Sequence, residues 1–156
     1  MSAVLASAAP DLAAVKAQAQ QAMNLSRATY KVVDDYQQVL NVVAGPDVTH
    51  ATMKAAPFAP NAVGDVYWDR ERQIFVFLFA NLPEPGDGKT YQVWLWKDGA
   101  ASSGGTFSPS PSGLATKIVP SAGGGLKEFD GIEVTVESTA GSDTPSGPDV
   151  IQLPIN

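Results

Sequence analysis

Two hydrophobic patterns divide the chain near residues 44–48. Residues 11–43 contain no glycine and no proline, and their apolar positions follow the three-and-four spacing of an amphipathic helix. This pattern predicts one long helix over residues 11–43, about 50 Å long at the usual rise per residue. Asp11 is a candidate N-cap or first-turn acid, and Gly45-Pro46 supplies the signal that ends the helix.

The apolar seam of this helix is weak in its middle, where alanine, serine and threonine occupy it. The seam fits two arrangements equally well. One is a coiled-coil or homodimer arm, and the other is a helix that lies on the rest of its own domain. Residues 1–10 are alanine-rich but lack the basic start of a signal peptide. We therefore expect them to be a disordered or cloning-derived N-terminus.

From residue 48 onward, short apolar runs alternate with glycine, proline and serine clusters, as in β-strands joined by turns. Residues 46–156 are therefore predicted to form a mainly β domain, an antiparallel β-sandwich of about eight strands of the immunoglobulin-like or Greek-key type. The expected strands are residues 48–54, 64–69, 73–80, 90–97, 103–107, 115–119, 132–138 and 150–153. The short polar stretch "DRER", Asp69 to Arg72, predicts a hairpin between the second and third strands.

Two of these strands are apolar on both faces. In "KTYQVWLWKDG", Lys89 to Gly99, tyrosine, valine and leucine alternate with Gln92, Trp94 and Trp96, and "IFVFLFA" is apolar throughout. Because a half-exposed strand has one polar face, both faces of these strands need a cover. We expect the partner sheet on one face. The long helix, from the same chain or from a neighbour, is the candidate for the other.

Composition excludes several classes of function. The net charge of −6 and the isoelectric point of about 4.5 argue against a nucleic-acid partner and against a polybasic contact with lipid. The absence of cysteine excludes disulfides, thiolate catalysis and thiolate zinc sites. No apolar run approaches the roughly 18–20 residues that cross a bilayer.

Candidate catalytic and binding residues are few. His50 is the only histidine, and no acid cluster is spaced to join it, so we expect a surface or interface residue and no metal, cofactor or catalytic triad. Glu133 and Glu137 share a strand face with Thr135, which is typical of a solvated face. An enzyme is therefore not predicted.

The aromatic side chains leave a second function open. Tyr67, Trp68, Trp94 and Trp96 could form a platform for sugar, as in a secreted module that binds carbohydrate or a cell-surface polymer. Aromatic residues in neighbouring strands more often belong to a core or an interface, and we favour that interpretation.

Several short motifs, in order, resemble one known family over roughly residues 46–153. They are "LPEPGDGKTYQVWLWKDG", "GGTFSPSPSGLATKIV" and "IEVTVESTAGSDTPSGPDVIQL". The chain resembles the C-terminal domain of anti-sigma-K factors of the RskA type. The matching positions, which we expect to hold the fold, are Leu82, Pro83, Lys89, Tyr91, Gln92, Trp94, Leu95, Gly105, Thr106, Phe107, Val134, Thr135, Val136, Glu137, Pro145, Gly147 and Pro148.

The resemblance implies the extracytoplasmic regulatory domain of a single-pass membrane protein in a bacterium. Such proteins hold an extracytoplasmic-function sigma factor through a cytoplasmic domain and release it after regulated proteolysis by a site-1-type protease. This sequence shows neither that cytoplasmic domain nor a transmembrane segment. The resemblance therefore implies contact with a sigma factor and with the membrane only through segments that this sequence lacks. It also implies a protease or other extracytoplasmic regulator as a partner. No nucleic-acid partner is expected.

Overall fold

The N-terminal element is the long helix that the sequence predicts. The structure is a computed structural model that describes residues 12–121 and 124–155, and it has a 32-residue helix α1 at Leu12–Val43. The Gly45 N–H donates to the Val42 carbonyl at 3.1 Å, so the helix ends at the predicted glycine. Residues 1–10 and the N-cap proposed at Asp11 lie outside the described residues.

Two compact units make up the chain, residues 1–40 and residues 41–156. Within the first unit, the apolar side chains of Leu12, Val15, Met23 and Leu25 are exposed. No helix among the described residues combines the length and apolar character that crossing a membrane requires.

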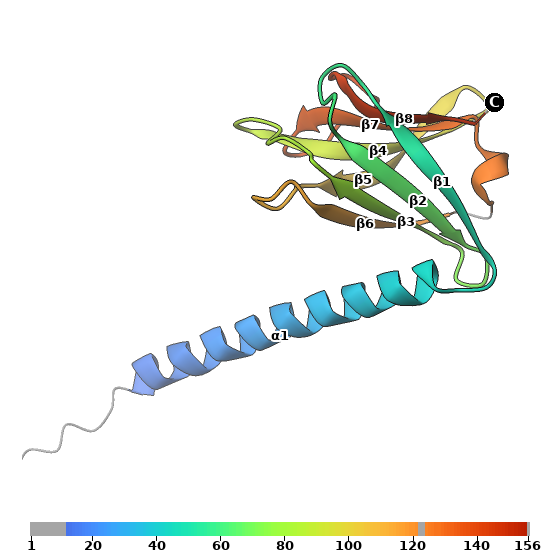
Figure 1. The fold of residues 1–156 in the computed structure, drawn as a ribbon. Coiled ribbons are helices and arrows are strands. Elements are labelled where there is room, and N and C mark those ends of the chain that lie inside the picture. Colours follow the sequence, from blue (N-terminus) through green and yellow to red (C-terminus); the bar gives the residue numbers. More distant parts are fainter. Residues whose placement is uncertain (1–11, 122–123, 156) are drawn as a thin grey trace, which may run out of the picture. The chain divides into compact units, whose positions relative to one another are not determined.

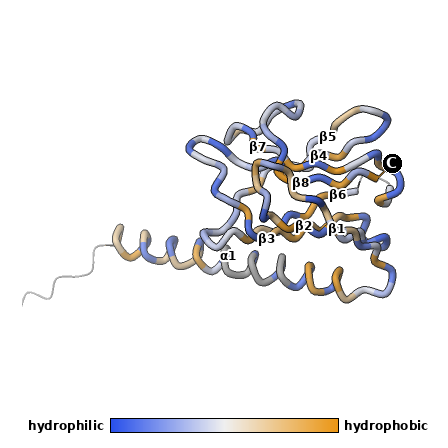
Figure 2. Tube along the Cα trace, turned by 45° about the horizontal axis from the view of Figure 1, so that its top comes forward, coloured by the Kyte–Doolittle hydropathy of each residue, from blue (hydrophilic) through white to orange (hydrophobic). Residues whose placement is uncertain are grey.

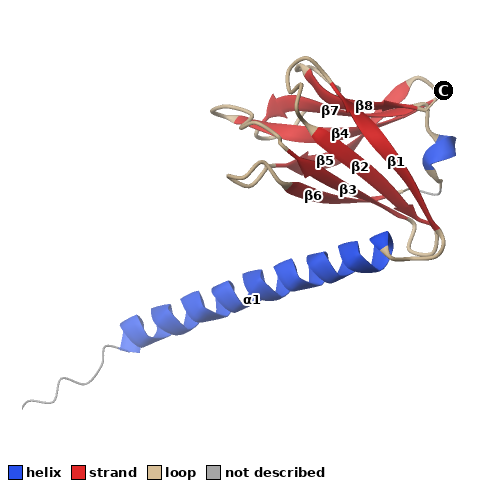
Figure 3. Ribbon diagram, viewed as in Figure 1, coloured by secondary structure: helices blue, strands red, loops and turns tan. Residues whose placement is uncertain are grey.

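The second unit consists almost entirely of strands (Figures 1 and 3). All eight predicted strands are present, with ends shifted by at most three residues. They are β1 Val48–Ala55, β2 Val63–Asp69, β3 Ile74–Ala80, β4 Lys89–Lys97, β5 Ala100–Phe107, β6 Ala115–Pro120, β7 Gly131–Ser138 and β8 Asp149–Pro154. A short 3₁₀ helix, η1 Leu126–Glu128, lies between β6 and β7, where the sequence predicts a loop.

The strands form a nearly closed antiparallel sheet in the order β5-β4-β7-β8-β1-β2-β3-β6. Strand β1 joins the two halves of this sheet, because its residues 48–53 pair with β2 and its last two residues pair with β8. The layer β1-β2-β3-β6 therefore packs against the layer β5-β4-β7-β8 in a sandwich, as predicted (Figure 1).

The core lies between these two layers. It takes its aromatic rings mainly from β3, where Phe75, Phe77 and Phe79 are buried, and from Tyr91 of β4. Phe79 stacks on Phe107 of β5 with ring centroids 4.9 Å apart. Hydrophobic residues concentrate in the strands, whereas the connecting loops are largely hydrophilic (Figure 2). Burial of the apolar side chains of these strands is therefore the main source of stability in this unit.

The outer strands β5 and β6 meet through side chains. Gly104 of β5 lies so close to β6 that an added Cβ would be 3.2 Å from both methyl groups of Val119. Lys117 of β6 extends to β5 and donates from Nζ to the Thr106 carbonyl at 3.2 Å. Gly105 has φ +90° and leaves room for that lysine, because a Cβ there would be 2.8 Å from Nζ.

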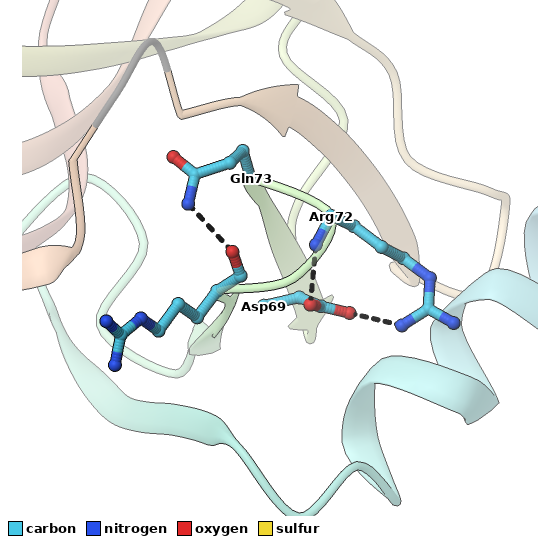
Figure 4. Close-up of polar contacts among 4 residues, drawn as sticks. Asp69, Arg72 and Gln73 are labelled. Atoms are coloured by element: carbon cyan, nitrogen blue, oxygen red, sulfur yellow. Dashed lines mark hydrogen bonds and ion pairs between the residues drawn. The ribbon is translucent and has the colours of Figure 1, made fainter.

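The "DRER" stretch forms the tight polar hairpin that the sequence predicts between β2 and β3. Buried Asp69 accepts from the Arg72 backbone N–H at 2.9 Å and from Arg72 Nη1 at 2.6 Å (Figure 4). Burial raises the pKa of Asp69, but the hydrogen bonds and charge of Arg72 outweigh burial and lower it. Gln73, at φ 54°, donates from Nε2 to the Arg70 carbonyl at 2.7 Å.

Candidate functional site

The outer face of β4 is covered by the chain itself. Tyr91, Val93 and Leu95 point into the core. On the opposite face Gln92 is 2 % exposed and Trp94 is fully buried. The cover on this face is the loop between β7 and β8, residues 139–148, called here the β7–β8 loop. The long helix, from this chain or from a neighbour, was the candidate cover for this face, and for β4 that expectation is wrong.

Gln92 pairs with the β7–β8 loop much as a neighbouring strand would. Its Oε1 accepts from the Ser142 N–H at 2.8 Å, and its Nε2 donates to the Ser142 carbonyl at 3.0 Å. The same Nε2 also donates to Ser103 Oγ of β5 at 2.8 Å. The side-chain amide therefore satisfies both backbone groups of a residue 50 positions away.

Trp94 begins a chain of buried hydrogen bonds that ends at Glu137. Its Nε1 donates to Thr135 Oγ1 at 2.8 Å, and the Thr135 hydroxyl donates to Glu137 Oε1 at 2.6 Å. Thr135 is fully buried and Glu137 is 1 % exposed. The prediction that Glu133, Thr135 and Glu137 form a solvated strand face is therefore wrong. The β7–β8 loop shields Thr135 and Glu137, and Glu133 is half-buried.

The Glu137 carboxylate is satisfied by five donors. Oε1 accepts from Thr135 and from the backbone N–H groups of Ser146 and Gly147, and Oε2 accepts from the hydroxyls of Ser142 and Ser146. Burial raises the pKa of Glu137, but the hydrogen bonds from Ser142, Ser146 and Thr135 outweigh it and lower the pKa to about 2. Glu137 is therefore an anion that anchors the loop, and it is poorly suited to act as a general base.

Glycine and proline complete the anchored end of the loop. The Val136 N–H donates to the Pro148 carbonyl at 3.1 Å. A Cβ on Gly147 would lie 1.7 Å from the Val136 carbonyl oxygen, so only glycine fits there. The structure thus brings together the motif positions Gln92, Trp94, Thr135, Glu137 and Gly147 with Ser142 and Ser146. These seven residues are called here the Glu137 cluster.

A second group of motif residues fixes the turn before β4. The Tyr91 hydroxyl donates to the Pro83 carbonyl at 2.6 Å, and the Leu82 N–H donates to the Gly113 carbonyl at 3.0 Å. Burial raises the pKa of Tyr91 to about 12. The hydroxyl of Tyr91 therefore stays protonated, and it remains a donor well above neutral pH.

The remaining motif positions lie in the core or on the surface. Leu95, Val134 and Val136 are buried in the core. Phe107 packs against the core and its carbonyl accepts from the Thr90 hydroxyl at 2.8 Å. Lys89 is exposed at the start of β4, and Pro145 lines a surface pocket beside Trp96. Gly105 and Thr106 are the β5 residues that meet Lys117.

The four aromatic residues considered for a sugar platform do not form one surface. Tyr67 stacks on His50 with ring centroids 4.6 Å apart, and Trp68 packs against the core with its Nε1 donating to Ser121 Oγ at 3.4 Å. Trp94 is buried and Trp96 is half-buried. The single histidine is exposed and lies 2.9 Å from Asp65 Oδ1. Among the described residues, no cluster of three or more acidic or histidine side chains is placed to hold a metal ion.

The sequence offered only indirect signals for the Glu137 cluster. A strand with two apolar faces showed that something covers β4, and the run "STAGSDTPSGP" after Glu137 is rich in hydroxyl and backbone donors. Neither signal shows which loop residues contact Gln92 or Glu137. The roles of Ser142 and Ser146 as donors to Glu137 were missed for this reason, although the two serines lie only 5 and 9 positions after it.

Comparison with known proteins gives one consistent result. The family model described as the C-terminal domain of anti-sigma-K factor RskA matches residues 1–149. An anti-sigma-K factor RskA from Mycobacterium ulcerans is 29% identical over 114 residues, which are 73% of this chain and 46% of that protein. A protein of the same name from Mycolicibacterium vanbaalenii is 29% identical over 115 residues, 73% of this chain and 45% of its own length.

A Streptomyces griseus protein described only by its gene's position is 27% identical over 110 residues, 70% of this chain and 43% of that protein. The chain thus spans less than half the length of these relatives. No solved structure matches it.

Proposed function

Because the chain belongs to the family of C-terminal domains of anti-sigma-K factors, we propose that it is the regulatory domain of an anti-sigma factor. The observation that carries this proposal is the family match over residues 1–149. The RskA relatives are more than twice as long as the segment they share with this chain. In this proposal, the part of the full-length protein that holds the sigma factor lies outside residues 1–156. A single membrane-spanning helix lies outside them as well.

In this proposal residues 46–156 lie outside the cytoplasm and control release of an extracytoplasmic-function sigma factor by regulated proteolysis. The β domain acts without catalysis. Its buried carboxylate, Glu137, is fully occupied by donors from its own chain, which supports a structural role for the motif residues. The acidic net charge of −6 suits a domain that meets neither nucleic acid nor anionic lipid directly.

The regulatory role is tested with the full-length protein in its bacterium, using a reporter driven by the cognate sigma factor. Deleting residues 46–156 is expected to change reporter output several-fold, because the cell would lose the domain that controls proteolysis. A deletion that leaves reporter output and its induction unchanged would contradict the role. Copurification of a sigma factor with the full-length protein is the accompanying measurement.

The location is tested by cysteine labelling, since the chain has no cysteine of its own. Lys127→Cys places a thiol on the exposed side of η1, and Ser121→Cys places one at a fully buried position. In intact cells, a membrane-impermeant maleimide is expected to label the first variant and not the second. Both should react once the protein is denatured. Labelling of Lys127→Cys only after lysis would place the domain in the cytoplasm.

A further inference from the structure

The β7–β8 loop buries Trp94 but leaves part of the outer face of β4 accessible at Trp96. Trp96 lies on the same face of β4 as Trp94 and is only half-buried. Its partners in the two flanking strands are Ala101 of β5 and Gly131 of β7. Because neither partner has a side chain larger than a methyl group, the flanking strands leave part of the indole ring open to a ligand.

Two pockets meet at this indole. One, of about 530 Å³, is lined by Trp96 and Glu133, by the start of β5, and by Thr144 and Pro145 of the β7–β8 loop. The other, of about 190 Å³, is also lined by Trp96 and Glu133 and extends over β7 to the end of β8. Because the two pockets share these two side chains, together they form a groove across the layer from β5 to β8, called here the Trp96 groove.

The Trp96 groove combines an aromatic ring with a carboxylate in a fixed position. Glu133 Oε2 accepts from Trp96 Nε1 at 2.7 Å, which holds the carboxylate at the edge of the indole. A carboxylate offers about four acceptor positions, and the indole N–H takes one of them. An indole face and a carboxylate side by side are the two groups that recognise an organic cation. A planar guanidinium suits both, because it stacks on the ring and donates to the carboxylate.

Acidic side chains surround the Trp96 groove. Exposed aspartates lie within one residue of its lining at three places, Asp98, Asp130 and Asp143. Asp130 Oδ2 also accepts from the N–H of the lining residue Gly99 at 2.9 Å, so this carboxylate lies at the wall of the groove. The local charge therefore attracts a cation.

Two lysines near the groove do not occupy it. Lys97 follows Trp96 and lies on the opposite face of β4, where its Nζ is 5.8 Å from the centroid of the Phe129 ring. Lys54 of β1 is opposite Gln152 of β8, which is itself opposite Glu133. Lys54 is thus two strands away from Glu133, about 10 Å at the usual strand spacing. Neither ammonium group is placed on the indole face.

We propose that the Trp96 groove binds an arginine side chain of an extended basic peptide, with the guanidinium stacked on the Trp96 indole and donating to the Glu133 carboxylate. The apolar lining at Ala100, Ala101 and Pro145 takes the methylene groups of the side chain. This binding role goes beyond the regulatory role proposed above and does not depend on it.

The ionisation of Glu133 sets the conditions for binding. Burial raises its pKa to about 7, the acidic neighbours Asp149 and Glu137 act in the same direction, and the Trp96 indole acts against them. A cation at the carboxylate favours the ionised form and lowers this pKa. The affinity for arginine should therefore increase as the pH rises through 7.

The test is an NMR titration of the whole chain with a short peptide of alternating glycine and arginine whose ends are blocked. It is run at about pH 8, where Glu133 is mainly ionised. The matched probe has citrulline in place of arginine, which keeps the shape and removes the charge. We expect the arginine peptide to shift the Trp96 indole N–H and the amides of residues 99–101 and 143–146 along one saturable curve. The citrulline peptide should leave these signals in place.

Two glutamate variants locate the site. Glu133→Gln should weaken binding of the arginine peptide about tenfold or more, because the charged acceptor is lost. Glu84→Gln, at an exposed position in the β3–β4 connection, should leave the affinity unchanged. If Glu133→Gln does not fold, Thr144→Lys serves instead. Thr144 is exposed and lines the groove, so a lysine there would compete with the peptide and weaken its binding several-fold.

Four results would overturn the proposal. Equal shifts with the arginine and citrulline peptides would mean that the groove does not recognise charge. Shifts spread over the acidic surface, without saturation at the Trp96 indole, would mean nonspecific attraction only. Saturable shifts of the indole with maltotriose, and none with the arginine peptide, would assign the groove to neutral sugar. An affinity that is unchanged in Glu133→Gln, or in Thr144→Lys where that variant is used, would place the peptide elsewhere.

Discussion

Glu137→Ala is expected to lower the free energy of unfolding by about 3–4 kcal/mol, because it leaves several buried donors without an acceptor. The backbone N–H groups of Ser146 and Gly147 cannot reorient toward another acceptor. The hydroxyls of Ser142 and Ser146 can rotate toward one. Glu137→Gln is therefore the informative partner variant. Its amide oxygen can replace Oε1 and its NH₂ group can donate to the two hydroxyls, so a loss of about 1–2 kcal/mol is expected.

Urea unfolding measures both variants, with Glu84→Ala as the control for loss of an exposed glutamate. The pH dependence gives a second check. Because the folded-state pKa of Glu137 is lowered from 4.5 to about 2, its contribution is present above pH 4.5 and is lost as the pH falls toward 2. That contribution amounts to at most about 3 kcal/mol. If the free energy of unfolding falls equally with pH in the wild type and in Glu137→Gln, Glu137 is not the source of the loss of stability in acid.

Trp94→Ala is expected to cost about 3–5 kcal/mol, the range for removing a fully buried aromatic side chain. The loss combines the cavity under the β7–β8 loop with a missing donor to Thr135, whose hydroxyl bridges to Glu137. Trp94→Phe keeps most of the ring volume and removes the N–H. Its loss in free energy of unfolding should therefore be about half that of Trp94→Ala or less.

Trp96→Ala is the matched control, since Trp96 occupies the same face of β4 and is only half-buried. Thermal or urea unfolding of Trp94→Ala, Trp94→Phe and Trp96→Ala should show that Trp94→Ala is the least stable of the three. Equal stability of Trp94→Ala and Trp96→Ala would mean that the loop does not need the buried indole. Limited proteolysis within residues 139–148 should accelerate in Trp94→Ala.

The strands could be predicted because their signals are local. The apolar run "IFVFLFA" and the polar turn at Asp69–Arg72 identify β3 and its hairpin with β2 from neighbouring residues alone, and the hairpin is confirmed. The β5 strand was predicted three residues short at its start. "AASSGG" has little β propensity, and it is extended because β4 pairs with it across the two-residue turn at Asp98-Gly99.

The cover of β4 could not be predicted in the same way. Trp94 and Glu137 lie in different strands, and Ser142 and Ser146 belong to a loop with no periodic pattern. The alternation of Val134, Thr135, Val136 and Glu137 is the same for a solvated face and for a face hidden under a loop. Only the fold distinguishes the two, because the distinction depends on contacts between residues up to 50 positions apart.

The place of β1 in the sheet decides how this domain would bear a mechanical load. The chain enters the domain at Val48, and β1 is an inner strand flanked by β2 and β8. A pull on the N-terminal side would therefore act on a strand whose two ladders join both layers of the sandwich. Extracting such a strand requires shearing several hydrogen bonds at once, whereas an edge strand such as β6 could be peeled away one bond at a time.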